Sequence, residues 1–304
     1  MDGPHGLAVT ARDFGLRGPR GWAFRDVRVD AGPGSLIAVA GPSGSGRTCL
    51  LLALTGRMRP TDGTATVGGL RLPRQMSALR RISALAHVPG VTDLDPALTV
   101  AEHLRERALL QRRFGASARD LLRPRAERAA KARLLADTAL SAAGLDPETL
   151  PKGLRTAVRD LERTEALRLS IALALAGRPR LLGVDDADLK LSAAEREEIW
   201  SLLASIAASG TTVVAVCGEA PGDAVTVSTR PDTAPRTAPD TAPDGGGEAG
   251  DHGEDGEGSA VDEPGDDGED TADTAHGDTR REDTDHTDDV TEEAAGALAE
   301  TRRA

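Results

Sequence analysis

The sequence contains no tyrosine, and its 304 residues include only three phenylalanines, two tryptophans and two cysteines. Two cysteines cannot build the dense disulfide framework of a small secreted domain, so a buried core must supply the stability. No apolar run approaches the roughly 18 residues that a membrane-spanning helix needs. Residues 1–13 also lack the basic and apolar regions of a secretory signal. We therefore expect a cytoplasmic chain with reduced thiols.

Charge is distributed unevenly along the chain. Residues 221–304 hold 25 Asp and Glu against six Arg, a net charge of −19, so residues 1–220 carry +7 of the overall −12. The acidic segment is punctuated by proline and has too little apolar content to offset the entropy of ordering it. We predict a folded unit over residues 1–220 and a disordered, acidic, low-complexity tail over residues 221–304. A core charge of +7 beside such a tail argues against nucleic acid as a partner.

Short apolar runs alternate with helical patterns, which predicts an α/β fold with a largely parallel sheet. A long stretch, about residues 99–177, has apolar residues at helical spacing and predicts an inserted helical subdomain. Strands are expected at 7–14, 27–32, 35–40, 82–90, 180–186 and 211–218, a hairpin at 60–73, and further helices at 47–57 and 191–209.

Residues 41–48 read Gly-Pro-Ser-Gly-Ser-Gly-Arg-Thr and match a phosphate-binding loop at every position except Arg47, where the pattern has lysine. An apolar strand precedes the loop and a helix follows it, so backbone N–H groups can converge on a polyphosphate at the positive helix end. Thr48 would offer its hydroxyl to Mg²⁺. A glycine-rich turn that binds nothing is the alternative. Arg47 keeps the charge but not the shape of lysine, so it either binds phosphate in another pose or clashes with it.

Four segments in order resemble an ATP-binding cassette (ABC) ATPase subunit, over about residues 7–219. The run AGPGSLIAVAGPSGSGRT resembles the strand and Walker A loop, and LDPALTVAEHL resembles the entry to the helical subdomain. ALRLSIALALAGRPRLLGVDD resembles the helix after the signature motif followed by Walker B, and GTTVVAVCGE resembles the strand that leads to the switch histidine. The resemblance implies a P-loop NTPase fold of ABC type.

Several motif positions depart from the family pattern. Gly90 stands at the Q-loop glutamine, Leu161-Glu-Arg-Thr-Glu165 at the LSGGQ signature, and Gly218 at the switch histidine. Neither glycine can orient a water or donate a hydrogen bond to a γ-phosphate through a side chain. The carboxylates of the altered signature would face an anion.

Walker B is altered less. Asp185 remains, Asp186 replaces the catalytic glutamate with a side chain one methylene shorter, and Ser192 stands at the D-loop aspartate. The resemblance leaves Asp186 as the catalytic candidate, with a solvated residue at a strand end as the alternative. Thr48 and Asp185 are the candidate Mg²⁺ ligands.

The resemblance further implies ATP and Mg²⁺ as cofactors. An aromatic residue after the first strand stacks on adenine in the family; Phe14 lies near that position, with Trp22 as the alternative and a core role for Phe14 as another. No metal-ligand cluster stands out, and we expect His87 and His103 to be structural or surface groups. The candidate nucleotide contacts are Phe14, Gly41, Pro42, Ser43, Gly44, Ser45, Gly46, Arg47, Thr48 and Cys49.

The leading hypothesis is the cytoplasmic nucleotide-binding subunit of an ABC transporter, bound to an integral membrane permease at the inner face of the membrane. It would pair with a second ABC-type subunit, bind ATP, and hydrolyse it weakly or not at all. The alternative is a catalytically inactive regulatory or scaffold protein with the ABC fold.

Overall fold

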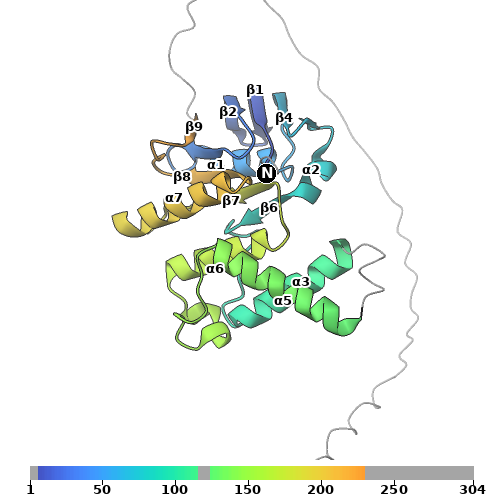
Figure 1. Cartoon of the computed structure of the whole chain (residues 1–304). Helices are drawn as coiled ribbons and strands as arrows, with labels where there is room; N and C mark the ends of the chain where they lie inside the picture. Colours follow the sequence, from blue (N-terminus) through green and yellow to red (C-terminus); the bar gives the residue numbers. More distant parts are fainter. Residues whose placement is uncertain (1–5, 116–123, 230–304) are drawn as a thin grey trace, which may run out of the picture. The chain divides into compact units, whose positions relative to one another are not determined.

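The computed structural model describes residues 6–115 and 124–229 of the chain (Figure 1). The chain divides into two compact units, Met1–Thr237 and Ala238–Ala304, and all described residues belong to the first. The expectation of a disordered tail therefore falls almost entirely outside the described residues.

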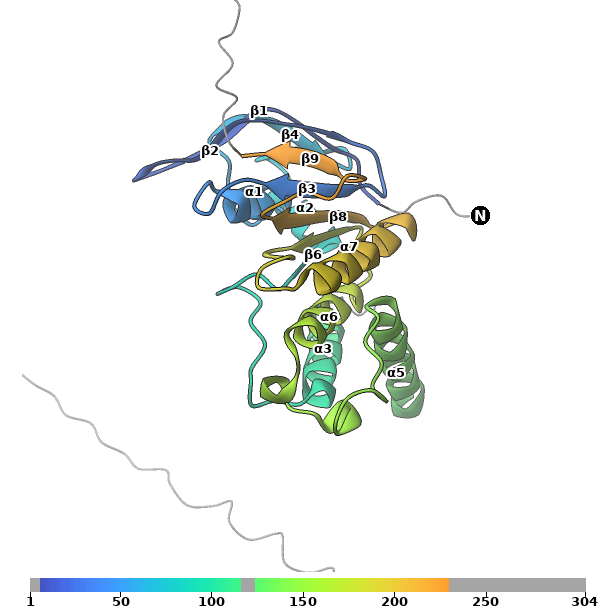
Figure 2. The same ribbon diagram turned by 90° about the vertical axis from the view of Figure 1, so that its left-hand side faces the viewer.

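A parallel sheet of five strands, ordered β6-β7-β8-β3-β9, forms the centre of this unit (Figure 2). Three of its strands are short and fully buried runs of the kind that the sequence analysis identified as core strands. The strands are β3 Leu36–Ala40, β6 Ser83–Ala86, β7 Leu181–Val184, β8 Thr212–Cys217 and β9 Val225–Ser228.

A second, antiparallel sheet has the order β2-β1-β4-β5. Its first two strands are longer than expected, because the glycine- and arginine-rich stretch between the two predicted strands continues the hairpin and leaves only Pro19 and Arg20 as the turn. The strands are β1 Val9–Gly18, β2 Gly21–Ala31, β4 Asp62–Val67 and β5 Leu70–Leu72.

Six α-helices complete the described fold, and the sequence analysis missed only the short α2. The stretch expected to be helical, residues 99–177, contains α3, α5 and α6, with two short 3₁₀ turns between α5 and α6. No helix in the described ranges is both long enough and apolar enough to cross a membrane. The helices are α1 Arg47–Leu54, α2 Met76–Ile82, α3 Val100–Gly115, α5 Arg125–Ala142, α6 Arg163–Leu175 and α7 Ala193–Ala208.

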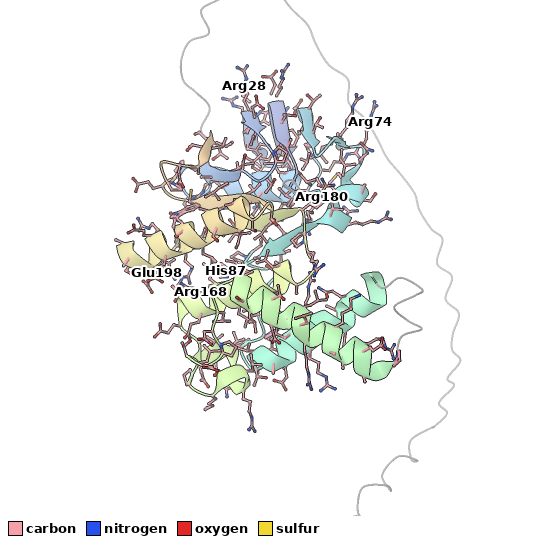
Figure 3. The ribbon with its side chains drawn as sticks, in the orientation of Figure 1. Arg28, Arg74, His87, Arg168, Arg180 and Glu198 are labelled. Carbon is pink, nitrogen blue, oxygen red and sulfur yellow. The ribbon has the colours of Figure 1, made fainter. Side chains whose placement is uncertain are left out.

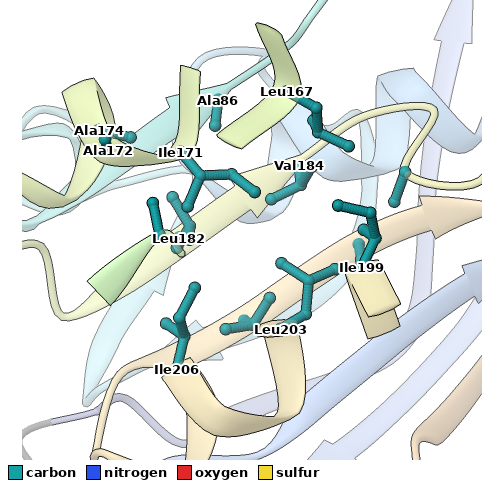
Figure 4. Packing of buried hydrophobic residues seen from close by; sticks show 14 of the residues in the cluster. Ala86, Leu167, Ile171, Ala172, Ala174, Leu182, Val184, Ile199, Leu203 and Ile206 are labelled. Atoms are coloured by element: carbon teal, nitrogen blue, oxygen red, sulfur yellow. The ribbon is translucent and has the colours of Figure 1, made fainter. Parts of the chain in front are cut away.

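The parallel sheet is covered on both faces, as buried parallel strands require. On one face, alternate residues such as Leu182 and Val184 pack against Ile171 of α6 and Ile199 of α7 (Figure 4). On the other face, residues such as Ile37 and Val39 pack against α1 and the antiparallel sheet. The two cores hold the carboxyl ends of all five parallel strands at one edge.

The boundary at residue 220 is wrong. Strand β9 lies beyond it and pairs in parallel with β3, with Val225 opposite Ile37 and Val227 opposite Val39. Val227 is 3% exposed and belongs to the core shared with the antiparallel sheet. The sequence does not reveal this strand, because its four residues alternate valine with Thr and Ser at the start of the polar segment. The folded unit therefore includes at least residue 229.

We predict that ending the chain at residue 220 lowers stability, because it exposes β3 as an edge strand and removes the buried Val227. Burial of one valine side chain is worth about 1.5–3 kcal/mol, and the backbone hydrogen bonds of β9 add to this loss. A chain ending at residue 229 serves as the control and should unfold like the full-length protein. Urea unfolding followed by circular dichroism compares the three, and equal midpoints for all of them would show that β9 is dispensable.

Candidate nucleotide-binding site

The loops that follow β3, β6, β7 and β8 meet at the carboxyl edge of the sheet. Ala40 of β3 lies opposite Cys217 of β8, and Ala86 of β6 lies opposite Val184 of β7. The residues after these strand ends are therefore close together, although they are far apart in the chain. In open α/β sheets this edge is where ligands bind.

The glycine-rich loop after β3 has the shape of an anion-binding turn. Gly44 and Gly46 have φ values of 80° and 83°, a region that favours glycine. A Cβ on Gly46 would lie 1.9 Å from the carbonyl oxygen of Ala23 in β2, so only glycine fits there, whereas the space around Gly44 is open. Helix α1 begins at Arg47, and its first N–H groups, having no partner one turn earlier, point toward this loop.

Thr48 and Asp185 are brought together as the sequence analysis expected. The Thr48 hydroxyl donates to Asp185 Oδ2 at 2.8 Å, which joins the first turn of α1 to the end of β7. Asp185 is only 2% exposed, and this burial raises the pKa of its carboxyl group, while the hydrogen bond from Thr48 opposes the shift. A hydroxyl and one buried carboxylate fit Mg²⁺, which proteins usually bind through one or two carboxylates together with substrate phosphates.

Arg47 does not extend into open space. Its Nη1 donates to the backbone carbonyl of Cys217 at the end of β8. The next residue, Gly218, donates its N–H to Asp188 Oδ2 at 2.9 Å. Burial, and secondarily the charge of Asp188, raises the pKa of the Cys217 thiol to about 12. The end of β8, where the family has its switch histidine, is thus bonded to Arg47 of the glycine-rich loop and to Asp188, which follows the Walker B segment.

The segment that replaces the signature motif makes its contacts within the chain. Arg163 Nε donates to the carbonyl oxygen of Leu189 at 2.7 Å, and the N–H of Glu162 donates to Glu165 Oε2 at 2.8 Å. Helix α6 begins here with a capping box in which glutamate carboxylates meet the helix N-terminus. Its own side chains therefore take the place that an anion would need.

Two other altered positions have structural roles. Gly90 has a φ of 74° and donates its N–H to Asp93 Oδ2 at 2.8 Å, which closes a tight turn after β6. Ser192 caps α7, where its hydroxyl accepts from the N–H of Glu195 at 3.3 Å and Glu195 accepts from Ser192 in return at 2.7 Å. Neither position presents a side chain that is free to bind phosphate.

His87 also lies at this edge, although only a structural or surface role is expected for it from the sequence. It follows β6 with a φ of 49° where the sheet meets α6 (Figure 3), and its N–H donates to Ser170 Oγ at 2.7 Å. Burial, followed by the charge of Arg163, lowers the pKa of His87, while Asp186 and Asp93 act in the opposite direction. The imidazole is therefore near Asp186, the catalytic candidate. Only the parallel register of β6 and β7 reveals this, because the two residues are far apart in the chain.

The expectation for Phe14 as an adenine platform is wrong. Phe14 is 0% exposed and packs against Phe24 with ring centroids 5.7 Å apart, so it is a core residue. Trp22, the alternative, is 43% exposed, and the Arg17 guanidinium lies 5.8 Å from its ring centroid. Trp22 immediately precedes Ala23, whose carbonyl oxygen contacts the glycine-rich loop. Cys49, in the first turn of α1, is partly buried, and this burial, followed by the charge of Asp185, raises the pKa of its thiol.

Comparison with known proteins identifies the family of this chain. The sequence profile of the ABC transporter family matches residues 24–188, more than half of the chain. The chain therefore belongs to the ABC transporter family. The matched residues include the glycine-rich loop, Asp185 and Asp186.

Two curated relatives and one solved structure show the extent of the likeness. The Nod factor export ATP-binding protein I of Cupriavidus metallidurans is 31% identical over 186 residues, which are 61% of this chain and 54% of the relative. The cytochrome c biogenesis ATP-binding export protein CcmA of Pseudomonas putida is 39% identical over 101 residues, or 32% of this chain and 47% of that protein. The matched part of the chain thus spans about half the length of these relatives.

A solved ATP-binding cassette, a dimer in a post-hydrolysis state bound to ADP and Pi, has a TM-score of 0.53 at 22% identity. The alignment covers 69% of this chain and 88% of that one. Identity at this level shows the fold alone. The α/β P-loop fold of ABC type, expected from the sequence, is confirmed.

His87 should make stability depend on pH. Its folded-state pKa lies below the unfolded value of about 6.5, so the unfolded chain binds the proton more readily. The stabilisation that the neutral His87 side chain gives the folded state is fully present above pH 6.5, and it is lost as the pH falls toward the folded-state pKa. His87→Asn suits the left-handed backbone and cannot titrate, so we expect a smaller loss of unfolding free energy between pH 7.5 and 5.5 in this variant. Urea unfolding at both pH values measures it, and equal losses would exclude this role for His87.

Proposed function

We propose that this chain is the ATP-binding subunit of an ABC transporter, in which MgATP binds at the carboxyl edge of the parallel sheet. The observation that carries the proposal is the glycine-rich loop at the start of α1 together with the hydrogen bond of 2.8 Å between Thr48 and Asp185. Backbone N–H groups of the loop would hold the phosphates. Thr48 and Asp185 would hold Mg²⁺, which neutralises phosphate charge when it is bound.

The proposed phosphate contacts include the positions named from the sequence. Trp22 replaces Phe14 as the proposed adenine platform. Of these two side chains only that of Trp22 is exposed, and Trp22 precedes Ala23, whose carbonyl oxygen contacts the glycine-rich loop. We further propose a nucleotide-binding domain that reaches residue 229, with a helical subdomain within residues 99–177. The proposed phosphate contacts are Gly41, Pro42, Ser43, Gly44, Ser45, Gly46, Arg47, Thr48 and Cys49.

The transporter role extends what the relatives' names describe. Both are named as ATP-binding proteins of export systems, and we propose that this chain likewise works with an integral membrane permease at the inner face of the membrane. A second ABC-type subunit, identical or different, would complete the assembly. The solved ATP-binding cassette that resembles this chain is itself a dimer.

We propose that hydrolysis is slow or absent, because the groups that would act on the γ-phosphate are missing or already used. Gly90 and Gly218 offer no side chain, and the N-terminus of α6 is capped by the chain's own glutamates. Asp186, with a φ of 46°, is the remaining candidate for polarising an attacking water. Phosphoryl transfer depends on positioning and on charge around the transferred group, so several losses together should reduce turnover strongly.

A second candidate function is a regulatory or scaffold protein that keeps the ABC fold without nucleotide turnover. The contact between Arg47 and the Cys217 carbonyl favours it, because the only basic side chain of the glycine-rich loop is already paired within the chain. Direct measurement of nucleotide binding separates the two functions.

We predict that the full-length chain binds MgATP more weakly than P-loop proteins that have the lysine, and that Trp22 reports the binding. The chain has two tryptophans and no tyrosine, and Trp200 is only 8% exposed, so a Trp200→Phe background isolates the Trp22 fluorescence. In that background, MgATP should quench Trp22 in a saturable manner. Loss of base stacking in Trp22→Ala should weaken binding by about 1–3 kcal/mol, which is roughly 5- to 150-fold.

Phe14→Leu is the matched control for Trp22→Ala. It keeps the core apolar at a buried position and should leave affinity nearly unchanged, as measured by equilibrium titration with a labelled ATP analogue. Absence of saturable binding up to millimolar MgATP in the unmodified protein would favour the scaffold function.

We predict that Arg47→Lys tightens MgATP binding more than it restores turnover. Lysine presents a compact ammonium that suits the phosphates, whereas the other γ-phosphate groups stay absent. Titration and a phosphate-release assay on the same preparation measure the two effects. Rapid hydrolysis by the unmodified protein would contradict the proposed impairment, and Asp186→Asn is the control that identifies any residual turnover at this site.

A further inference from the structure

Strand β9 places a threonine directly behind the glycine-rich loop. Thr229 follows β9 and is 4% exposed. Its N–H donates to the carbonyl oxygen of Ala40, the last residue of β3, at 3.2 Å. Its hydroxyl lies 2.6 Å from the hydroxyl of Ser45 in the loop. Thr229 therefore contacts both the strand that leads into the loop and the loop itself.

The same hydroxyl lies at the entrance of the loop. A Cβ on Gly41 would approach Thr229 Oγ1 to 2.6 Å and Ser45 Oγ to 2.8 Å. The two hydroxyl groups thus fill the space beside Gly41. Within the loop, the N–H of Ser45 donates to the carbonyl oxygen of Pro42 at 3.2 Å. The Ser45 side chain thus ties the loop to the residue that follows β9.

We propose that Thr229 is a positioning residue for the phosphate-binding loop: its hydroxyl, bonded to Ser45, holds the loop in the shape that receives the phosphates of a nucleotide. The inference deepens the proposed function and depends on it for the identity of the ligand. It assigns a role in the site to a residue beyond residue 220 and outside the glycine-rich motif. Thr229 acts through Ser45 and touches no phosphate itself.

The hydrogen bond between Ser45 and Thr229 restricts the Ser45 side chain. A buried hydroxyl that is left unpaired loses more free energy than a hydrogen bond contributes. The bond to the buried Thr229 hydroxyl therefore holds the partly buried Ser45 side chain toward Thr229 and away from the open side of the loop. Removing the hydroxyl of Thr229 frees Ser45 to adopt other rotamers, and the phosphate ligand must then restore the order of the loop when it binds. The effect should appear with phosphate-bearing ligands and be absent for adenosine.

The decisive comparison is between Thr229→Val and Thr229→Ser in the full-length chain. Valine keeps the volume and removes the hydroxyl, whereas serine keeps the hydroxyl and removes a methyl group. We expect Thr229→Val to weaken MgATP and MgADP binding about fivefold, with adenosine binding unchanged and with Thr229→Ser close to the unmodified protein. Ser45→Ala should weaken binding similarly, and Thr229→Val should add nothing further in the Ser45→Ala background, because both changes remove the same bond.

A measurement that needs no nucleotide separates this proposal from the proposed function. Hydrogen exchange of the peptide that covers residues 41–48 should be faster in Thr229→Val than in Thr229→Ser, while exchange in α7 stays the same. If the unmodified protein binds no MgATP, the proposed function fails, and faster loop exchange still supports the positioning role. Unchanged loop exchange overturns the proposal, as does equal MgATP affinity in the valine and serine variants of a protein that binds it. A loss of stability without either effect would show a purely structural role.

Discussion

The hydrogen bond from Thr48 to Asp185 is the contact on which the arrangement of the site depends. It links the helix after β3 to the end of β7, two strands that are separated in the sheet by β8. Asp185 is buried, its Oδ2 accepts from this neutral hydroxyl, and its Oδ1 accepts from the N–H of Asp186 at 3.1 Å. An unpaired buried carboxylate would be costly, so the link fixes α1 against the sheet and keeps two oxygen groups at one point. The remaining contacts of the edge are arranged around it.

Contacts within the chain replace contacts with nucleotide at several neighbouring positions. Arg47 pairs with the carbonyl of Cys217, Asp188 accepts from the N–H of Gly218, and Arg163 reaches the carbonyl of Leu189. The first contact joins the start of α1 to the end of β8, the second joins the segments after β7 and β8, and the third joins the start of α6 to the segment after β7. These polar groups are therefore already hydrogen-bonded within the chain. The retained frame and the substituted side chains are the basis of the proposal that this site binds nucleotide and turns it over slowly or not at all.

The sequence predicted those features that depend on local patterns. The glycine-rich loop, the apolar strands on either side of it and the Walker B run are continuous segments, and the structure has them where they were expected. Phe14 could not be assigned, because a single aromatic residue in a strand fits either a core or an exposed face, and bulges in the pairing of β1 with β2 decide which face it takes. His87 could not be placed near Asp186 without the register of β6 against β7. Strand β9 was missed because its partner, β3, lies nearly 200 residues earlier in the chain.

In the proposed site, competition between the Cys217 carbonyl and phosphate for Arg47 would set the scale of nucleotide affinity. A hydrogen bond from a charged donor contributes about 1.5–3 kcal/mol, and MgATP must offset this loss whenever Arg47 leaves the Cys217 carbonyl to meet a phosphate. Since about 1.4 kcal/mol corresponds to a factor of ten, the internal contact alone could weaken binding by roughly ten- to more than a hundredfold. If the guanidinium stays in place, the loop N–H groups and Mg²⁺ must hold the phosphates without a basic side chain. In both cases, the contact between Arg47 and the Cys217 carbonyl would lower the affinity of the proposed site for nucleotide.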